Sequence, residues 1–184
     1  YEKKTLLTKG QFNINDDSEI KLSYTGNRSD GVLYPTGTMD ADYDDSNIYT
    51  VGYTARNLAD FSKELNLDYY YSNVDHPMST KLRNNGATSY MTAFYKTSIW
   101  GTKLKNSMEV ADSLLTVGLD TSVRNWRGEK YSTNVATGVS GVSTISLAST
   151  DTTNKAIFAK VEKSFGKLDL EFGSRYDYSD VDSS

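Results

Sequence analysis

Strict alternation of apolar and polar residues constrains this chain more than any other feature of its sequence. In four segments, apolar side chains occupy every second position and the residues between them are polar or charged. A period of two places these two kinds of side chain on opposite faces of a strand, whereas a helix repeats about every 3.6 residues. The four segments are residues 19–25, 64–72, 115–124 and 168–178. We therefore predict strands that have one apolar and one polar face.

Four further segments have the composition of strands, although their two faces are less cleanly divided. They are rich in Tyr, Phe, Thr and Val, the residues that favour extended structure, and comprise residues 3–13, 47–56, 88–103 and 155–165. The sequence contains 14 Tyr but only 2 Pro, which also suits strands. We expect an all-β chain of about eight strands.

The predicted links between these strands alternate in length. Short links at residues 15–17, 57–60, 105–112 and 166–167 separate long polar links at 29–46, 73–86 and 128–154. Short turns at one rim and long loops at the other are the plan of an outer-membrane barrel. We therefore predict an antiparallel up-and-down meander that forms a segment of a larger outer-membrane β-barrel. The long links are expected to be loops: 29–46 acidic and solvated, and 132–154 mobile.

Composition excludes several classes of function. The chain has no Cys, which removes disulfides, thiol catalysis and Cys-ligated zinc. Its net charge of −4 includes no basic stripe, so we expect no nucleic-acid partner. No segment has the roughly 20 apolar residues of a membrane-spanning helix. No phosphate-binding loop or catalytic constellation is evident either, so we expect no enzymatic activity.

Two stretches resemble a known family. Residues 67–78, which read LDYYYSNVDHPM, and residues 115–126, which read LTVGLDTSVRNW, are similar to barrel strands of the TonB-dependent receptors, in particular the copper receptors. The resemblance implies location in the bacterial outer membrane and energy-coupled uptake of a metal, with copper as the expected cargo. It implies four partners: outer-membrane lipid, the receptor's own plug domain, the TonB complex, and the metal or metal chelate.

The same resemblance points to His76 and Met78 as metal ligands. In the copper receptors a His-x-Met pair near the outer mouth of the barrel joins residues of the plug to hold copper, and His76-Pro77-Met78 matches it. The soft Met sulfur favours Cu(I), and imidazole suits either oxidation state. Residues two apart in an extended segment point the same way, so both side chains are able to face one ion. The alternative is that His76, the only His in the chain, is an ordinary solvated loop residue.

Residues 1–184 are accordingly expected to be a partial transmembrane barrel without signal peptide, plug or closing strand, and with copper bound only in the intact receptor. Three alternatives stay open: a receptor for a siderophore or other metal chelate, a passive outer-membrane pore, and a soluble β-sandwich adhesin or binding module. In a membrane barrel, Trp100 and Trp126 are expected to lie in the interfacial aromatic belt.

Overall fold

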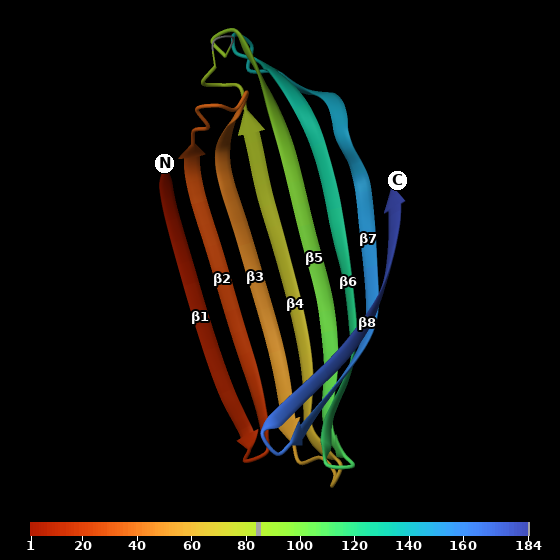
Figure 1. The fold of residues 1–184 in the computed structure, drawn as a ribbon. Coiled ribbons are helices and arrows are strands. Elements are labelled where there is room, and N and C mark those ends of the chain that lie inside the picture. The colour runs from red at the N-terminus through yellow and green to blue at the C-terminus, as the bar shows by residue number, and fades with distance from the viewer. Residues whose placement is uncertain (84–85, 184) are drawn as a thin grey trace.

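The computed structural model describes residues 1–83 and 86–183 as one antiparallel sheet in the order β1 to β8 (Figure 1). Its strands are β1 (Glu2–Asn15), β2 (Ser18–Val32), β3 (Asp40–Arg56), β4 (Ser62–Ser79), β5 (Ser89–Val110), β6 (Ser113–Asn134), β7 (Ser140–Phe165) and β8 (Leu168–Ser183). Each strand pairs with its neighbours in sequence, which confirms the predicted eight-stranded meander. The described residues contain no helix long and apolar enough to cross a membrane.

The links gather at the two ends of the sheet as predicted, but the strands are longer than expected. Residues 16–17, 57–61, 111–112 and 166–167 turn at one end. The longer links, of which the structure describes residues 33–39, 80–83, 86–88 and 135–139, lie together at the other end, which we call the mouth (Figure 1). The predicted loops 29–46, 73–86 and 128–154 were therefore wrong in extent, because most of their residues are strand. Backbone pairing continues there through residues that do not alternate between apolar and polar, so the sequence pattern could not reveal it.

The turn between β5 and β6 is built from two residues with left-handed backbone. Ala111 has φ 50° and Asp112 has φ 54°, as a two-residue type I′ hairpin requires at both central positions. An alanine in this conformation is strained by about 1–2 kcal/mol, whereas glycine adopts it freely at an entropic cost of about 0.5–1 kcal/mol. The backbone at Ala111 is therefore slightly strained, and a glycine at this position would relieve the strain.

We accordingly expect Ala111→Gly to raise the free energy of unfolding of the intact protein by about 0.5–1 kcal/mol, because the relief of strain exceeds the added entropy of the unfolded chain. Urea unfolding in detergent, followed by tryptophan fluorescence, measures it. Gly10→Ala, which alters a glycine whose φ is not left-handed and whose surroundings are open, is the control. A loss of stability in Ala111→Gly would contradict the turn assignment.

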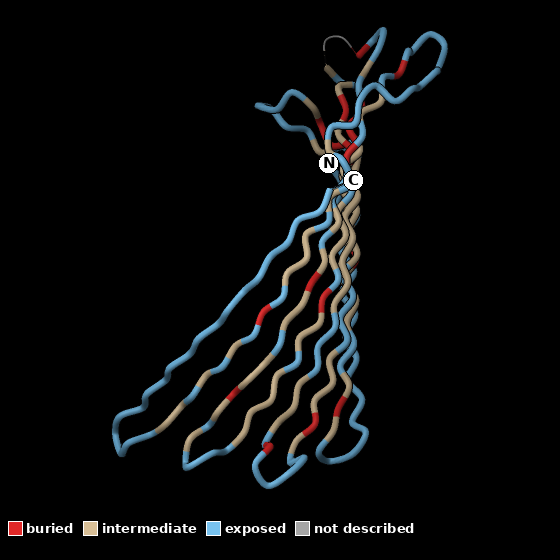
Figure 2. The backbone as a smooth tube through the Cα atoms, turned by 90° about the vertical axis from the view of Figure 1, so that its right-hand side faces the viewer, coloured by how far each residue is buried: buried red, intermediate tan, exposed pale blue. Residues whose placement is uncertain are grey.

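Apolar side chains from all eight strands line up in one row across the sheet. This apolar row consists of Phe12, Ile20, Tyr53, Leu67, Leu104, Leu119, Ile157 and Tyr176. Directly paired residues on neighbouring strands share a face, so the register defines an apolar face. Phe12 is 66% exposed and Tyr176 is 67% exposed. Figure 2 shows how few of the described residues are buried, and the apolar face therefore has no packed layer over it.

Toward the mouth the apolar face ends in an aromatic belt. Four residues beyond the apolar row on each strand, Tyr24, Tyr49, Tyr71 and Trp100 are neighbours on β2 to β5. The rings of Tyr24 and Tyr49 lie 5.0 Å apart and those of Tyr49 and Tyr71 6.2 Å apart. We call this line of residues the aromatic row. The next row on the same face is polar: Gly26, Asn47, Asn73, Ser98, Asn125, Asp151 and Asp182. Such a succession is typical of the level at which a membrane barrel leaves the hydrocarbon.

The two tryptophans lie on different faces. Trp100 belongs to the aromatic row, as predicted. Trp126 pairs with Thr97 on β5 and Thr150 on β7, and this register puts it on the opposite, polar face. The predicted belt position of Trp126 is therefore wrong. A strand can carry a tryptophan on either face, and only the pairing register with its neighbours shows which face it is.

The polar face carries ion pairs both within single strands and between different strands. Near the short turns, Glu19 accepts hydrogen bonds from Lys21 and Arg56, both at 2.9 Å. At β8, Arg175 lies 3.3 Å from Asp120 on β6. Arg175 also bonds to Asp177 at 2.8 Å. The charged residues that alternate with apolar ones in the sequence are thus paired mainly with each other.

Three glycines on the polar face lie directly opposite aromatic rings. Three cross-strand pairs follow this rule, namely Tyr70 with Gly101, Phe158 with Gly118 and Tyr95 with Gly128. In each pair an added Cβ would lie within 2.5 Å of the ring. A ring that lies across a glycine covers the backbone of the neighbouring strand, so these glycines are required for packing rather than for turns.

Candidate functional site

Both residues predicted as metal ligands lie in the part of β4 that extends past the aromatic row toward the mouth. His76 pairs with Tyr95 and Met78 pairs with Ala93, both on β5. The pairing between β4 and β5 is regular from Glu64 to Ser79, so His76 and Met78 share the face of Glu64, which is the polar face. The alternative of a loop histidine is wrong in one respect, because His76 lies in a paired strand.

An irregularity in β3 lies directly beside these residues. Ala41 pairs with Met78 and Asp45 with Asp75, so the β3 side of this stretch contains one more residue than the β4 side. Pro77 falls opposite this bulge and is almost fully buried. Proline has no N–H to donate, and bulges are the places where an interior strand tolerates it. The rigid proline therefore lies between the two candidate ligands without breaking a regular ladder.

Asp44 makes the polar contact that the structure records for His76. The Nδ1 atom of His76 lies 3.3 Å from Oδ2 of Asp44, and the imidazole is 28% exposed. A carboxylate at Nδ1 selects the tautomer in which Nδ1 carries hydrogen and leaves Nε2 free as an acceptor or ligand. Because Asp44 precedes His76 by a full hairpin, no spacing in the sequence pointed to this contact.

Met78 is placed between two small residues. Its partners on either side are Ala41 and Ala93, whose exposed fractions are 1% and 0%. Met78 itself is half-buried. Small neighbours on the same face leave space around a long flexible side chain, so the thioether has room to move toward a ligand on the polar face.

Two other aspartates of β3 contact β4 and the link after it. Ser79 donates a hydrogen bond of 2.7 Å to Asp42, and Arg83 forms an ion pair with Asp40, which is 5% exposed. Arg83 also donates to the carbonyl of Tyr34 at 2.9 Å. The prediction of a freely solvated acidic loop is therefore wrong at Asp40, which is a buried and paired carboxylate that ties together two links of the mouth.

On the apolar face, side chains of β5 and β6 also contact each other between the aromatic row and the mouth. Phe94 and Tyr131 meet edge to face with their centroids 5.6 Å apart. Tyr131 donates a hydrogen bond of 2.5 Å to Glu129, and this bond to the carboxylate raises the pKa of Tyr131 above its ordinary value. A phenol that stays protonated is a poor metal ligand, so Tyr131 supports the mouth rather than extending the site.

Within the described residues, no group of three or more His, Asp and Glu is placed to hold a metal ion. A histidine, a methionine and one nearby carboxylate on one face therefore make an incomplete set that needs further ligands from outside these strands.

Further from the mouth on the same face, the guanidinium of Arg124 lies 5.4 Å from the ring of Trp126. Sequence reasoning missed this cation–π pair, because it had assigned Trp126 to the other face.

Comparison with known proteins gives a consistent result. The family model described as "TonB dependent receptor-like, beta-barrel" matches residues 3–184, and no curated protein matches the chain. Among the matching solved structures is "Copper transporter OprC", at a TM-score of 0.84 and 18% identity. That match covers 98% of this chain but 30% of the transporter chain, so the strands span less than a third of the other protein. At this identity the likeness concerns the fold.

Proposed function

Because the chain belongs to the TonB-dependent receptor β-barrel family, we propose that it forms part of the barrel wall of an outer-membrane receptor that takes up a metal, with copper as its cargo. This family consists of receptors and transporters rather than enzymes. In the proposal, the apolar face contacts lipid, the polar face lines the barrel interior, and the mouth opens to the outside. The plug domain and the TonB complex are the partners that such a receptor needs.

The observation that carries the copper proposal is the placement of His76 and Met78 on the polar face of β4, beside the bulge and Asp44. Imidazole and thioether together suit copper better than a hard cation such as Mg²⁺. Asp44 would orient the imidazole so that Nε2 faces the ion. The remaining ligands would come from the plug, which lies inside the barrel in this proposal.

Removal of either ligand should lower copper binding. We expect His76→Ala and Met78→Leu in the purified full-length receptor to weaken Cu(I) affinity roughly tenfold or more, which corresponds to about 1.4 kcal/mol. Met78→Leu should affect Cu(I) more than Zn(II), because it removes only the soft sulfur.

The measurement is competitive titration with a Cu(I) chelator, together with metal content by mass spectrometry. Met108→Leu is the matched control, since it makes the same substitution on the apolar face near the short turns, and it should bind copper normally. If His76→Ala and Met78→Leu both retain full copper affinity, the site assignment fails and the cargo has to be sought elsewhere.

One observation favours a metal chelate as the second candidate cargo. Arg124 and Trp126 line a hollow of about 350 Å³ on the polar face, together with Ile99 of β5. Among the described residues Arg124 has no carboxylate partner, so it is free to meet an anionic, planar ligand by charge and stacking. A receptor that binds a copper chelate but not the free ion in the titration above would favour this candidate.

A further inference from the structure

The part of β3 that contains Asp44 is not fixed to β4 by regular backbone pairing. The register between β3 and β4 shifts between Ala41 and Asp45, and in the described sheet the three residues between them have no partner on β4. A bulge of this kind interrupts the ladder of backbone hydrogen bonds. The position of Asp44 relative to His76 therefore depends on side-chain contacts around the bulge.

Asp40, just before the bulge, is held by both neighbouring links of the mouth. Its Oδ1 atom accepts a hydrogen bond of 2.9 Å from the N–H of Tyr34, in the link that precedes β3. The same Oδ1 atom is paired with Nη2 of Arg83, in the link that follows β4. Nη2 of Arg83 also donates to the carbonyl of Tyr34 at 2.9 Å. These three residues thus form a closed set of contacts, which we call the clamp.

Burial makes the clamp sensitive to the loss of Arg83. Asp40 is 5% exposed, and among the described residues Arg83 is the one cation within ion-pair distance of it. A buried carboxylate that loses its cationic partner keeps an uncompensated charge, which is strongly unfavourable. Without Arg83, we expect Asp40 to move toward water and to take the start of β3 with it.

A displacement of Asp40 would reach Asp44 through four residues of the same strand. Asp42 lies between them and accepts a hydrogen bond of 2.7 Å from Ser79 on β4, but this bond alone would leave the bulge free to rotate about Asp42. The contact at Asp44 is easily lost, because its Oδ2 atom lies 3.3 Å from Nδ1 of His76. That distance is slightly longer than the roughly 2.7–3.2 Å of an ordinary N–H···O hydrogen bond.

We infer that Arg83 is a positioning residue of the proposed metal site: through the clamp it fixes the bulge of β3, and the bulge keeps Asp44 against Nδ1 of His76. The inference rests on the proposed copper function, in which Nε2 of His76 faces the ion. A carboxylate at Nδ1 selects the tautomer whose Nε2 is free. Release of Asp44 would let hydrogen move to Nε2, the atom that has to bind the metal, so Arg83 acts on the metal without contacting it.

The geometry of the clamp indicates which replacements of Arg83 keep it closed. Both contacts of Arg83 come from one nitrogen, and its Nε is buried without a hydrogen-bond partner among the described residues. An ammonium group has three donors on one atom, so Arg83→Lys should keep the clamp, whereas Arg83→Gln should release it. Asp40→Asn combined with Arg83→Gln should restore most of the parent geometry, because no unpaired carboxylate stays buried.

The tautomer of His76 tests the inference without any metal. Full-length receptor with isotopically labelled histidine is placed in lipid, and solid-state NMR at about pH 8, above the usual imidazole pKa, distinguishes the two neutral tautomers. The signal that His76→Ala lacks belongs to His76. We expect hydrogen on Nδ1 in the parent, in Arg83→Lys and in the double variant with Asp40→Asn, but mainly on Nε2 in Arg83→Gln.

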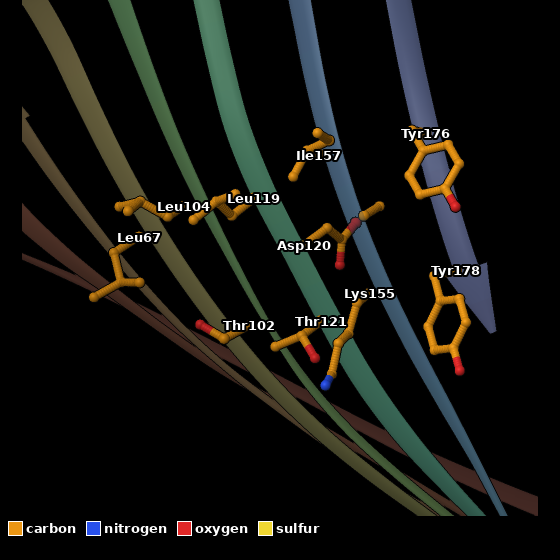
Figure 3. A pocket seen from close by; sticks show the side chains of 11 residues that line it. Leu67, Thr102, Leu104, Leu119, Asp120, Thr121, Lys155, Ile157, Tyr176 and Tyr178 are labelled. Carbon is orange, nitrogen blue, oxygen red and sulfur yellow. The ribbon is translucent and has the colours of Figure 1, made fainter. Parts of the chain in front are cut away.

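The control removes a positive charge from the other face. Lys155 lines the hollow of about 730 Å³ on the apolar face, together with residues such as Leu119 and Tyr178 (Figure 3). Lys155→Gln should therefore leave the tautomer of His76 as it is in the parent. An unchanged tautomer in Arg83→Gln would overturn the inference, and so would an equal change in Arg83→Gln and Lys155→Gln.

Copper affinity shows whether this positioning acts on the metal. In the chelator titration, Arg83→Gln should weaken Cu(I) binding about tenfold, the lower end of the loss expected when a group that orients a metal-binding histidine is removed. It should weaken binding no further when Asp44 is already Ala, because the effect passes through Asp44. Additive losses would overturn the inference. Full copper affinity in His76→Ala would refute the metal site itself, and the NMR result distinguishes that failure from a failure of the clamp.

Discussion

Leu67→Arg should destabilise the intact receptor by about 2–4 kcal/mol in a lipid bilayer, the cost expected for an arginine near the midplane on the lipid side of a barrel strand. Leu67 belongs to the apolar row and is 43% exposed. That row lies four residues inside the aromatic row, where the apolar face is continuous across all eight strands. The new charge would therefore have to leave water or distort the bilayer.

The neighbouring residue is the matched control. Asp68 lies on the polar face and is exposed, so Asp68→Arg should cost only a few tenths of a kcal/mol, mainly from the like charge of Lys103 directly opposite it. The measurement is folding into lipid vesicles over a urea series, followed by the gel mobility of the folded form. An equal loss in both variants would show that the two faces have been assigned the wrong way round, or that neither contacts lipid.

The alternation of residues was sufficient to predict four of the strands and their faces, because side chains that meet different surroundings on opposite faces must follow a period of two. At β8, for example, Leu170, Phe172 and Tyr176 share the apolar face as predicted. The extent of the strands could not be read in the same way. Past the aromatic row apolar residues no longer follow a period of two, so the alternation disappears although the backbone pairing continues to Ser79 and Asn134.

The candidate site shows the same limit. His76 and Met78 were predicted as ligands from a short motif that resembles the copper receptors, and a strand necessarily puts residues two apart on one face. Asp44 and the bulge opposite Pro77 depend on the register between β3 and β4, which shifts between Ala41 and Asp45. Such a shift leaves no regular trace in sequence. The role of Arg83 was not predicted for a related reason, because its contact with Asp40 depends on how β3 and the link after β4 meet at the mouth.

The glycines of the polar face lead to the last prediction. Gly118 on β6 lies directly opposite Phe158 on β7 and Lys105 on β5. An added Cβ there would lie 2.2 Å from Cζ of Phe158 and 2.7 Å from the carbonyl oxygen of Leu104. The ring can rotate away, but the carbonyl belongs to the paired backbone of β5 and cannot move without distorting the sheet.

We therefore expect Gly118→Val to lower the free energy of unfolding by about 3 kcal/mol, at the upper end of the cost of overpacking, although valine favours strands more than glycine does. Gly10→Val is the control, because nothing lies within 4 Å of the added Cβ, and its stability should be unchanged or slightly higher. Urea unfolding of the full-length receptor in vesicles compares the two. If Gly118→Val also removes the cation–π contact of Lys103 with Phe158, which lies at 5.2 Å, then Lys103→Gln should cost far less in Gly118→Val than in the parent protein. Additive losses in the double variant would instead mean that the ring stays in place and that the strain is carried by β5 alone.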